Sequence, residues 1–158
     1  MSLIRHDTWR VPVIKCLKLN SITKSLLLSG TLSTQAVLAN SQIKQGEHLY
    51  QTYCASCHGL SGGMDMKQRV APPIAGVRLH YINIHPDKAS FVAAVTDWLE
   101  QQDDNKSLMR GAIRRFNIMP PISLSKEDAQ KIAHYIYTGD LEKPEGFDKH
   151  VEEMHGKP

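Results

Sequence analysis

The sequence predicts an all-α fold built from three to four short helices. Two features carry this prediction. In several segments apolar residues recur every three or four positions, as on one face of an α-helix, and no segment keeps the two-residue alternation of a strand. Clusters of glycine and proline separate these segments. With 158 residues, 41% of them hydrophobic and 22% charged, the chain fits one globular domain with a targeting segment.

The first helix is predicted over residues 42–55. Apolar or small residues lie on one of its faces at three- and four-residue steps: Ile43, Gly46, Leu49, Tyr50 and Tyr53. A loop rich in glycine and proline follows, from Gly59 to Gly76.

Two or three further helices are expected after this loop. A middle helix fits residues 88–102, and a shorter one fits residues 108–116. The last helix begins at Ser125, whose hydroxyl can cap the amide of Asp128, and Gly139 is suited to end it. The domain thus covers residues 40–139, and the polar tail over residues 140–158 is expected to fray.

Residues 1–39 have the pattern of a cleavable export signal peptide. A basic stretch up to Lys24 precedes a short apolar stretch, and Val37 and Ala39 supply the small residues of a cleavage site. We therefore expect a periplasmic protein, with a membrane as partner only if the leader stays uncleaved. Two alternatives remain open, namely such an anchor and an ordinary first helix of the domain.

The positive charge of the chain belongs to this leader. The whole sequence carries 19 basic and 16 acidic residues, but five of the basic ones and one acidic one lie in residues 1–39. The remainder has 14 basic and 15 acidic residues, a net charge of −1. A protein that binds nucleic acid through a general excess of positive charge is therefore not expected.

The sharpest chemical signal is Cys54-Ala55-Ser56-Cys57-His58. Two thiols three positions apart, followed at once by a histidine, form the attachment pattern of c-type haem. The thiols can form thioethers with the two haem vinyl groups, and the imidazole can reach the iron from the same turn. Three alternatives are weaker. A disulfide between Cys54 and Cys57 would close a very small loop, a thioredoxin-like pair usually follows a strand, and a zinc site needs a fourth ligand.

On this motif the sequence resembles the class I c-type cytochromes, over roughly Gln42 to Gly139. In that family a glycine and an aromatic residue precede the motif on a helix, and Gly46 and Tyr50 occupy those places. An apolar–aromatic pair on the last helix packs against them, matched here by Ile132 and Tyr135. The resemblance implies a cytochrome c-like fold around one covalently bound haem c, attached through Cys54 and Cys57.

The resemblance also implies the two iron ligands, His58 and Met119. A proline-containing loop supplies a carbonyl that accepts the imidazole N–H, and Pro72 or Pro73 of Ala71-Pro72-Pro73-Ile74 is expected to do so. The distal methionine, usually followed by proline, is matched by Met119-Pro120-Pro121, 61 residues after His58.

Other candidates have ordinary interpretations as well. Met64, Met66, His80 and His85 are possible distal ligands, although each is more often a packing or solvated residue. Met109 is expected to be a packing or surface residue of the short helix. Several side chains are possible partners of the haem propionates: Trp98, Arg69, Arg78, Arg114 and Arg115.

These features predict an electron carrier and not an enzyme. The iron would cycle between the ferric and ferrous states with both ligands in place, and no small-molecule substrate is expected. Redox partner proteins should dock transiently, and the weakly acidic net charge predicts no strongly basic docking surface. Two alternatives remain: a subunit of a larger oxidoreductase, with residues 83–105 or the tail as contact surface, and a haem enzyme or gas sensor with an open iron position.

Overall fold

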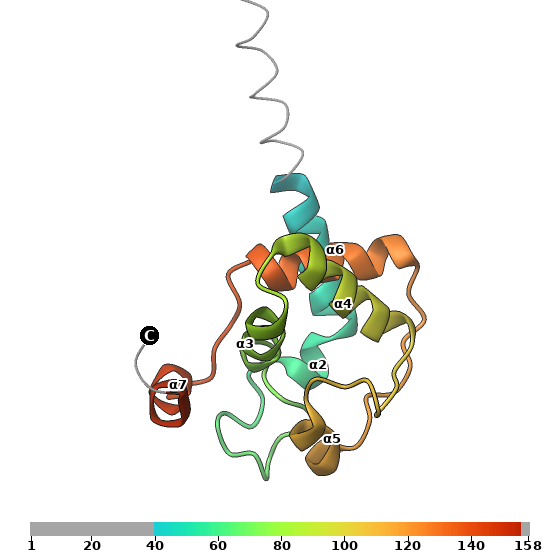
Figure 1. Ribbon diagram of the computed structural model, residues 1–158. Coiled ribbons are helices and arrows are strands. Elements are labelled where there is room, and N and C mark those ends of the chain that lie inside the picture. The colour runs from blue at the N-terminus through green and yellow to red at the C-terminus, as the bar shows by residue number, and fades with distance from the viewer. Residues whose placement is uncertain (1–39, 156–158) are drawn as a thin grey trace, which may run out of the picture. The chain divides into compact units, whose positions relative to one another are not determined.

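Two helices cross at Gly46 in the computed structural model, which describes residues 40–155 (Figure 1). The first helix runs over residues 40–53, and the second is α6 (Lys126–Thr138). A Cβ atom on Gly46 would overlap the backbone carbonyl of Lys131, so only glycine allows this approach. Next to the crossing, the rings of Tyr50 and Tyr135 pack with their centroids 5.5 Å apart. This is the contact that the family resemblance implied.

Helix α6 begins and ends where the sequence predicts. The Ser125 hydroxyl accepts a hydrogen bond from the Asp128 amide at 3.1 Å, and Gly139 follows the last turn. Gly139 does not adopt the left-handed conformation, because its φ is −72°. It is needed for space instead, since a Cβ atom there would lie 2.5 Å from ring atoms of Tyr135.

Helices α4 (Lys88–Glu100) and α5 (Arg110–Phe116) lie within the predicted ranges. Asp87 caps α4 by accepting a hydrogen bond from the Ser90 amide at 3.0 Å. Helix α4 packs along α6, and the two bury the centre of the core. The most deeply buried large side chains come from the first helix, α4 and α6: Tyr50, Phe91 and Ile132.

Helix α3 (Ile74–Ile84) overlaps the end of the loop predicted over Gly59 to Gly76 and continues into residues for which the sequence predicted no element. It begins directly after Pro73, whose carbonyl accepts hydrogen bonds from the amides of Gly76 and Val77. Proline is well suited to a helix start, because its φ is fixed and its missing amide is not needed there. Ile74 and Tyr81 are both buried. They are seven residues, or about two helical turns, apart and therefore lie on the same face of α3, so the helical period is present in the sequence.

The chain after Gly139 also differs from the expected fraying tail. Leu141 and Phe147 are buried, and Phe147 begins helix α7 (Phe147–His155). The Phe147 ring lies 3.8 Å from the position of a Cβ atom on Gly76, which places α7 beside α3 (Figure 1). Two apolar side chains thus hold a segment that is otherwise polar.

The described residues confirm the all-α prediction. Residues 40–155 contain seven helical segments and no strand. Within this range no helix has the length and apolar character needed to cross a membrane. Residues 1–39 lie outside the described residues, so the export signal and cleavage after Ala39 stay predictions.

Candidate functional site

The Cys54–His58 motif forms a short helix that continues the first one after a break. The Cys54 amide still bonds the Tyr50 carbonyl at 2.8 Å, but Cys54 has a φ of −120° and becomes the N-cap of α2 (Ala55–His58). The His58 amide then bonds the Cys54 carbonyl at 2.9 Å. The turn therefore carries both thiols and the imidazole together, as attachment to a single flat group requires.

The two thiols differ in their surroundings. Both are free, with Cys54 buried and Cys57 exposed. Burial raises the pKa of the Cys54 thiol to about 11, and the neighbouring Cys57 adds to this effect.

The His58 ring is held by a backbone carbonyl. Its Nδ1 lies 2.8 Å from the carbonyl oxygen of Pro72, so Nδ1 donates there and Nε2 remains for a ligand. Of the two prolines considered, the contact falls on Pro72, while Pro73 starts α3. Burial lowers the pKa of His58, although the Pro72 carbonyl acts in the opposite direction. The ring is therefore kept neutral and oriented, which is the state that binds a metal.

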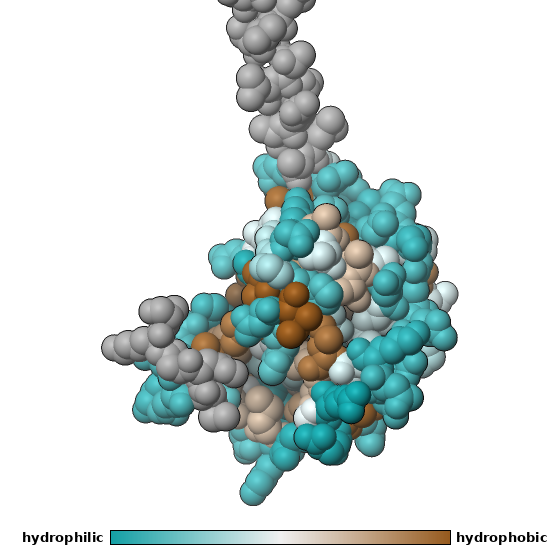
Figure 2. Space-filling model, viewed as in Figure 1, coloured by the Kyte–Doolittle hydropathy of each residue, from teal (hydrophilic) through white to brown (hydrophobic). Residues whose placement is uncertain are grey.

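His58 and both cysteines line an apolar cavity. Helix α3 contributes Ile74, Val77 and Tyr81, α4 contributes Val95, Trp98 and Leu99, and α6 contributes Ile132 and Ile136. A further part of the wall comes from α5 and the segment after it: Ala112, Ile113, Phe116, Asn117, Ile118, Met119, Pro120, Pro121 and Ile122. Figure 2 shows hydrophobic residues gathered in the centre of the face where Figure 1 shows α3 and α4.

The cavity separates the distal-ligand candidates into two groups. Met119 lines it, and so does Met109, which the sequence analysis treated as a packing or surface residue. Met64, Met66, His80 and His85 are not among its lining residues. The position of Met109 directly before α5 is what indicates that it lies at the cavity, because residues of that helix form part of the wall.

None of the four candidate arginines lines the cavity, so the structure gives no support to their pairing with propionates. Arg69 is buried and donates to carbonyls of its own loop, and Arg78 donates to the Gly139 carbonyl at 3.1 Å. Arg115 donates to the Met66 carbonyl at 3.2 Å. Trp98 does line the cavity, half-buried, and remains a candidate.

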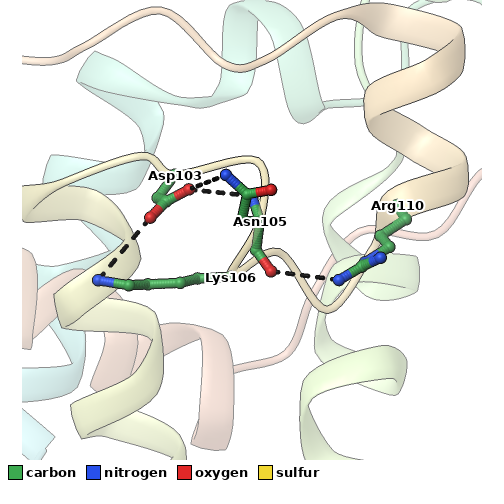
Figure 3. A network of polar contacts seen from close by, with 4 residues as sticks. All are labelled: Asp103, Asn105, Lys106 and Arg110. Atoms are coloured by element: carbon green, nitrogen blue, oxygen red, sulfur yellow. Dashed lines mark hydrogen bonds and ion pairs between the residues drawn. The ribbon is translucent and has the colours of Figure 1, made fainter.

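Positive charge gathers on the segment that includes α5. Residues 105–126 contain five lysines and arginines and no acidic residue. Lys126 pairs with Glu100 at 3.1 Å, and Lys106 lies 3.8 Å from Asp103. Arg110 donates only to the Asn105 carbonyl in the same loop (Figure 3), and Arg114 makes no hydrogen bond or ion pair with any residue of the range 40–155. The near-neutral net charge thus conceals a cationic segment beside the cavity, which the expectation of no basic surface overlooked.

The alternative interpretations of the motif find little support. The thiols are not joined, and no strand precedes them within the described range, as a thioredoxin-like pair would require. Over the same residues, no cluster of three or more histidine, cysteine or acidic side chains is arranged to hold a metal ion. A zinc site at Cys54, Cys57 and His58 would lack its fourth protein ligand.

Comparison with protein families assigns the domain. Residues 41–136 match the family model described as "Cytochrome C oxidase, cbb3-type, subunit III". The chain belongs to this family. No curated protein and no solved structure gives a significant match. Family membership confirms the resemblance to class I c-type cytochromes and makes this a haem-binding, electron-transfer domain.

The residues at the site fit the covalently bound haem c that the family implies. Two thiols and an imidazole lie on one turn at the edge of an apolar cavity, and that imidazole already has its Nδ1 engaged. A soft thioether, that of Met119, also borders the cavity. An apolar cavity with few convergent polar groups is what a flat hydrophobic cofactor needs.

Proposed function

We propose that this protein is a periplasmic monohaem c-type cytochrome that carries one electron at a time. Cys54 and Cys57 would hold the haem by thioethers, and His58 and Met119 would be the axial ligands. The observation that carries this proposal is the His58–Pro72 contact at the wall of an apolar cavity beside both cysteines. The bound haem supplies the one-electron couple of the iron.

The protein's own residues have three tasks in this function. The Pro72 carbonyl fixes the His58 ring and increases its basicity as a ligand. The apolar lining excludes water and favours a neutral thioether as the second ligand. Pro120 and Pro121, directly after Met119, restrict the backbone, so the ligand stays in place when the charge on the iron changes.

The surface at the cavity supports transient docking of a redox partner protein. Tyr53, Val70 and Ile118 line the cavity yet remain exposed, by 44%, 68% and 42%. Cys57 of the Cys54–His58 motif also lines the cavity and is exposed as well. An apolar rim next to the positive charge of α5 suits a brief encounter with a partner that carries acidic groups.

The visible spectrum and the mass of the purified protein test the proposal. The mature mass should equal the chain from Asn40 plus one haem, and acid acetone should leave the colour on the protein. Extraction of the pigment would reject covalent attachment. An N-terminal sequence beginning at Met1 would reject cleavage after Ala39 and favour an anchored domain.

A second candidate function is that of a cytochrome subunit within a larger oxidoreductase. The description of the family, as a subunit of an oxidase, favours it. Purification from native membranes separates the two functions. Recovery in a stoichiometric complex, with little free protein, would support the subunit role.

The open-site haem enzyme or sensor is the third candidate. Met119 at the cavity wall argues against it, because a bound thioether closes the sixth position of the iron. A six-coordinate, low-spin ferric spectrum and slow binding of carbon monoxide to the ferrous protein would agree with the carrier. A high-spin ferric spectrum would favour the enzyme or sensor.

A further inference from the structure

Arg69 is a buried cation without a carboxylate partner. Its exposure is 6%, and only Thr96 among the other polar residues of the range 40–155 is buried. None of the ion pairs found in that range involves it. Burial lowers the pKa of the guanidinium, which nevertheless stays protonated because its ordinary value is far above neutral. The fold therefore keeps one uncompensated positive charge inside.

Backbone carbonyls satisfy this charge. The guanidinium donates to the carbonyl of Gly59 at 2.6 Å, of Ser61 at 3.0 Å, of Gly63 at 2.9 Å and of Ala71 at 2.9 Å. Hydrogen bonds from a charged donor are stronger than those between neutral groups. Arg69 thus holds the loop after the haem motif closed from the inside.

The two ends of this loop are the two sides of the His58–Pro72 contact. Gly59 directly follows His58, and Ala71 directly precedes Pro72. By bonding both Gly59 and Ala71, Arg69 fixes the backbone next to the imidazole and next to the carbonyl that orients it. The clamp therefore acts on the geometry of the proximal side.

Gly62 leaves the space that the clamp needs. Its φ is +84°, and a Cβ atom there would come within 2.8 Å of Cγ of Arg69 and 3.0 Å of the Gln68 carbonyl oxygen. Only glycine adopts this conformation easily and avoids the arginine stem. Loop and side chain are thus fitted to each other.

We propose that Arg69 is a positioning residue for the proximal ligand, and that its buried positive charge favours ferrous over ferric iron. The proposal rests on the function proposed above. Ferric iron carries one more positive charge than ferrous iron, so a nearby cation in a poorly screened interior destabilises the ferric state more. The charge lies close to the ligand, since Arg69 donates to the carbonyl of Gly59, the residue that directly follows His58. Arg69 should therefore raise the reduction potential.

Two variants of the haem-loaded protein test this inference. Arg69→Gln removes the charge and keeps a hydrogen-bond donor, whereas Arg69→Lys keeps the charge. We expect Arg69→Gln to raise the ferric-to-ferrous ratio at a fixed applied potential about tenfold, which corresponds to 59 mV for a one-electron couple. Arg69→Lys should shift the ratio much less. The matched control is Arg78→Gln, since Arg78 is half-buried and also donates to a carbonyl, that of Gly139.

Two results would overturn the electrostatic role. One is a change below twofold in a folded Arg69→Gln variant. The other is an equal shift in Arg69→Lys and Arg69→Gln, which would leave only a structural clamp. If Arg69→Gln does not load haem, Arg69→Lys decides alone, because burial lowers the pKa of the introduced amine. Its potential should then fall more steeply with rising pH than that of the wild type, and parallel profiles would overturn the proposal. A protein without covalent haem would instead reject the proposed function itself.

Discussion

The carbonyl oxygen of Lys131 lies where a Cβ atom on Gly46 would have to be. Two helices meet here backbone to backbone, and neither atom belongs to a flexible side chain that could move aside. We expect Gly46→Ala to lower the free energy of unfolding by about 1–3 kcal/mol, as overpacking does, and toward the upper end of that range. Chemical denaturation of the haem-loaded protein measures this change.

Gly111→Ala is the matched control for this prediction. On α5 a Cβ atom at this position would meet only the end of the Arg114 side chain, 3.9 Å away. The substitution should leave stability unchanged or raise it by about 0.4–1 kcal/mol, because it restricts the unfolded chain. Equal stability of the two alanine variants would mean that the crossing is looser than the structure shows.

Two methionines line the cavity, so replacing each in turn identifies the distal ligand. Met119→Ala should remove the weak ferric sulfur-to-iron band at the red end of the spectrum, lower the reduction potential and open the iron to cyanide. A thioether favours ferrous iron more than water or imidazole does. Met109→Ala, the control, should keep the band. If only Met109→Ala loses it, the ligand assignment moves to Met109.

The haem should be required for a fixed core. In the folded chain an apolar cavity lies where packed side chains would otherwise be, and only nine aromatic residues follow residue 39. We expect a Cys54→Ala, Cys57→Ala variant to lose near-ultraviolet dichroism and keep part of its helix, as cofactor-dependent small domains do. Full helix and fixed aromatic signals in this variant would contradict the prediction.

The cationic segment around α5 should govern reactions with charged electron donors. Ferrocyanide should reduce the ferric protein faster than hexaammineruthenium(II) would at equal driving force, and its rate should fall as salt is added. In the double variant Arg114→Glu, Arg115→Glu, the rate of reduction by ferrocyanide at low salt should fall about tenfold. Lys143→Glu, Lys149→Glu changes the net charge equally near α7 and is the control. Equal slowing by both pairs would show that net charge, and not this segment, matters.

The pH dependence of stability has a contribution from His134. Burial lowers its pKa, and the charge of Lys88 lowers it further. The unfolded chain thus binds a proton on this ring at a higher pH than the folded protein does. The stability from neutral His134 is complete above the ordinary pKa of about 6.5 and is lost as the pH falls toward the lowered value. His134→Gln should therefore flatten the acid side of the profile of unfolding free energy against pH, measured by chemical denaturation at a series of pH values.

The sequence by itself determined the chemistry of the site and most of the helices. The Cys54–His58 pentapeptide is a local motif, so its spacing alone indicates haem attachment. Helices α4 and α5 follow from the apolar period, and α6 follows from the apolar period and the Ser125 cap, all of which are also local. Helix α3 does not follow from the sequence in the same way, because two adjacent prolines are typical of a loop, whereas in the structure Pro73 caps the start of the helix.

Only the tertiary structure decided the features that depend on distant residues meeting. The choice of Pro72 over Pro73, the second methionine at the cavity and the burial of Phe147 beside Gly76 all require segments far apart in the chain to be placed together. Arg69 is the clearest case. From the sequence alone, an arginine at this position is expected to be exposed to solvent. In the folded loop it is buried instead and donates to four carbonyls and to no carboxylate. Periodicity and spacing cannot show this, because the energy of a buried charge depends on which backbone groups the fold turns toward it.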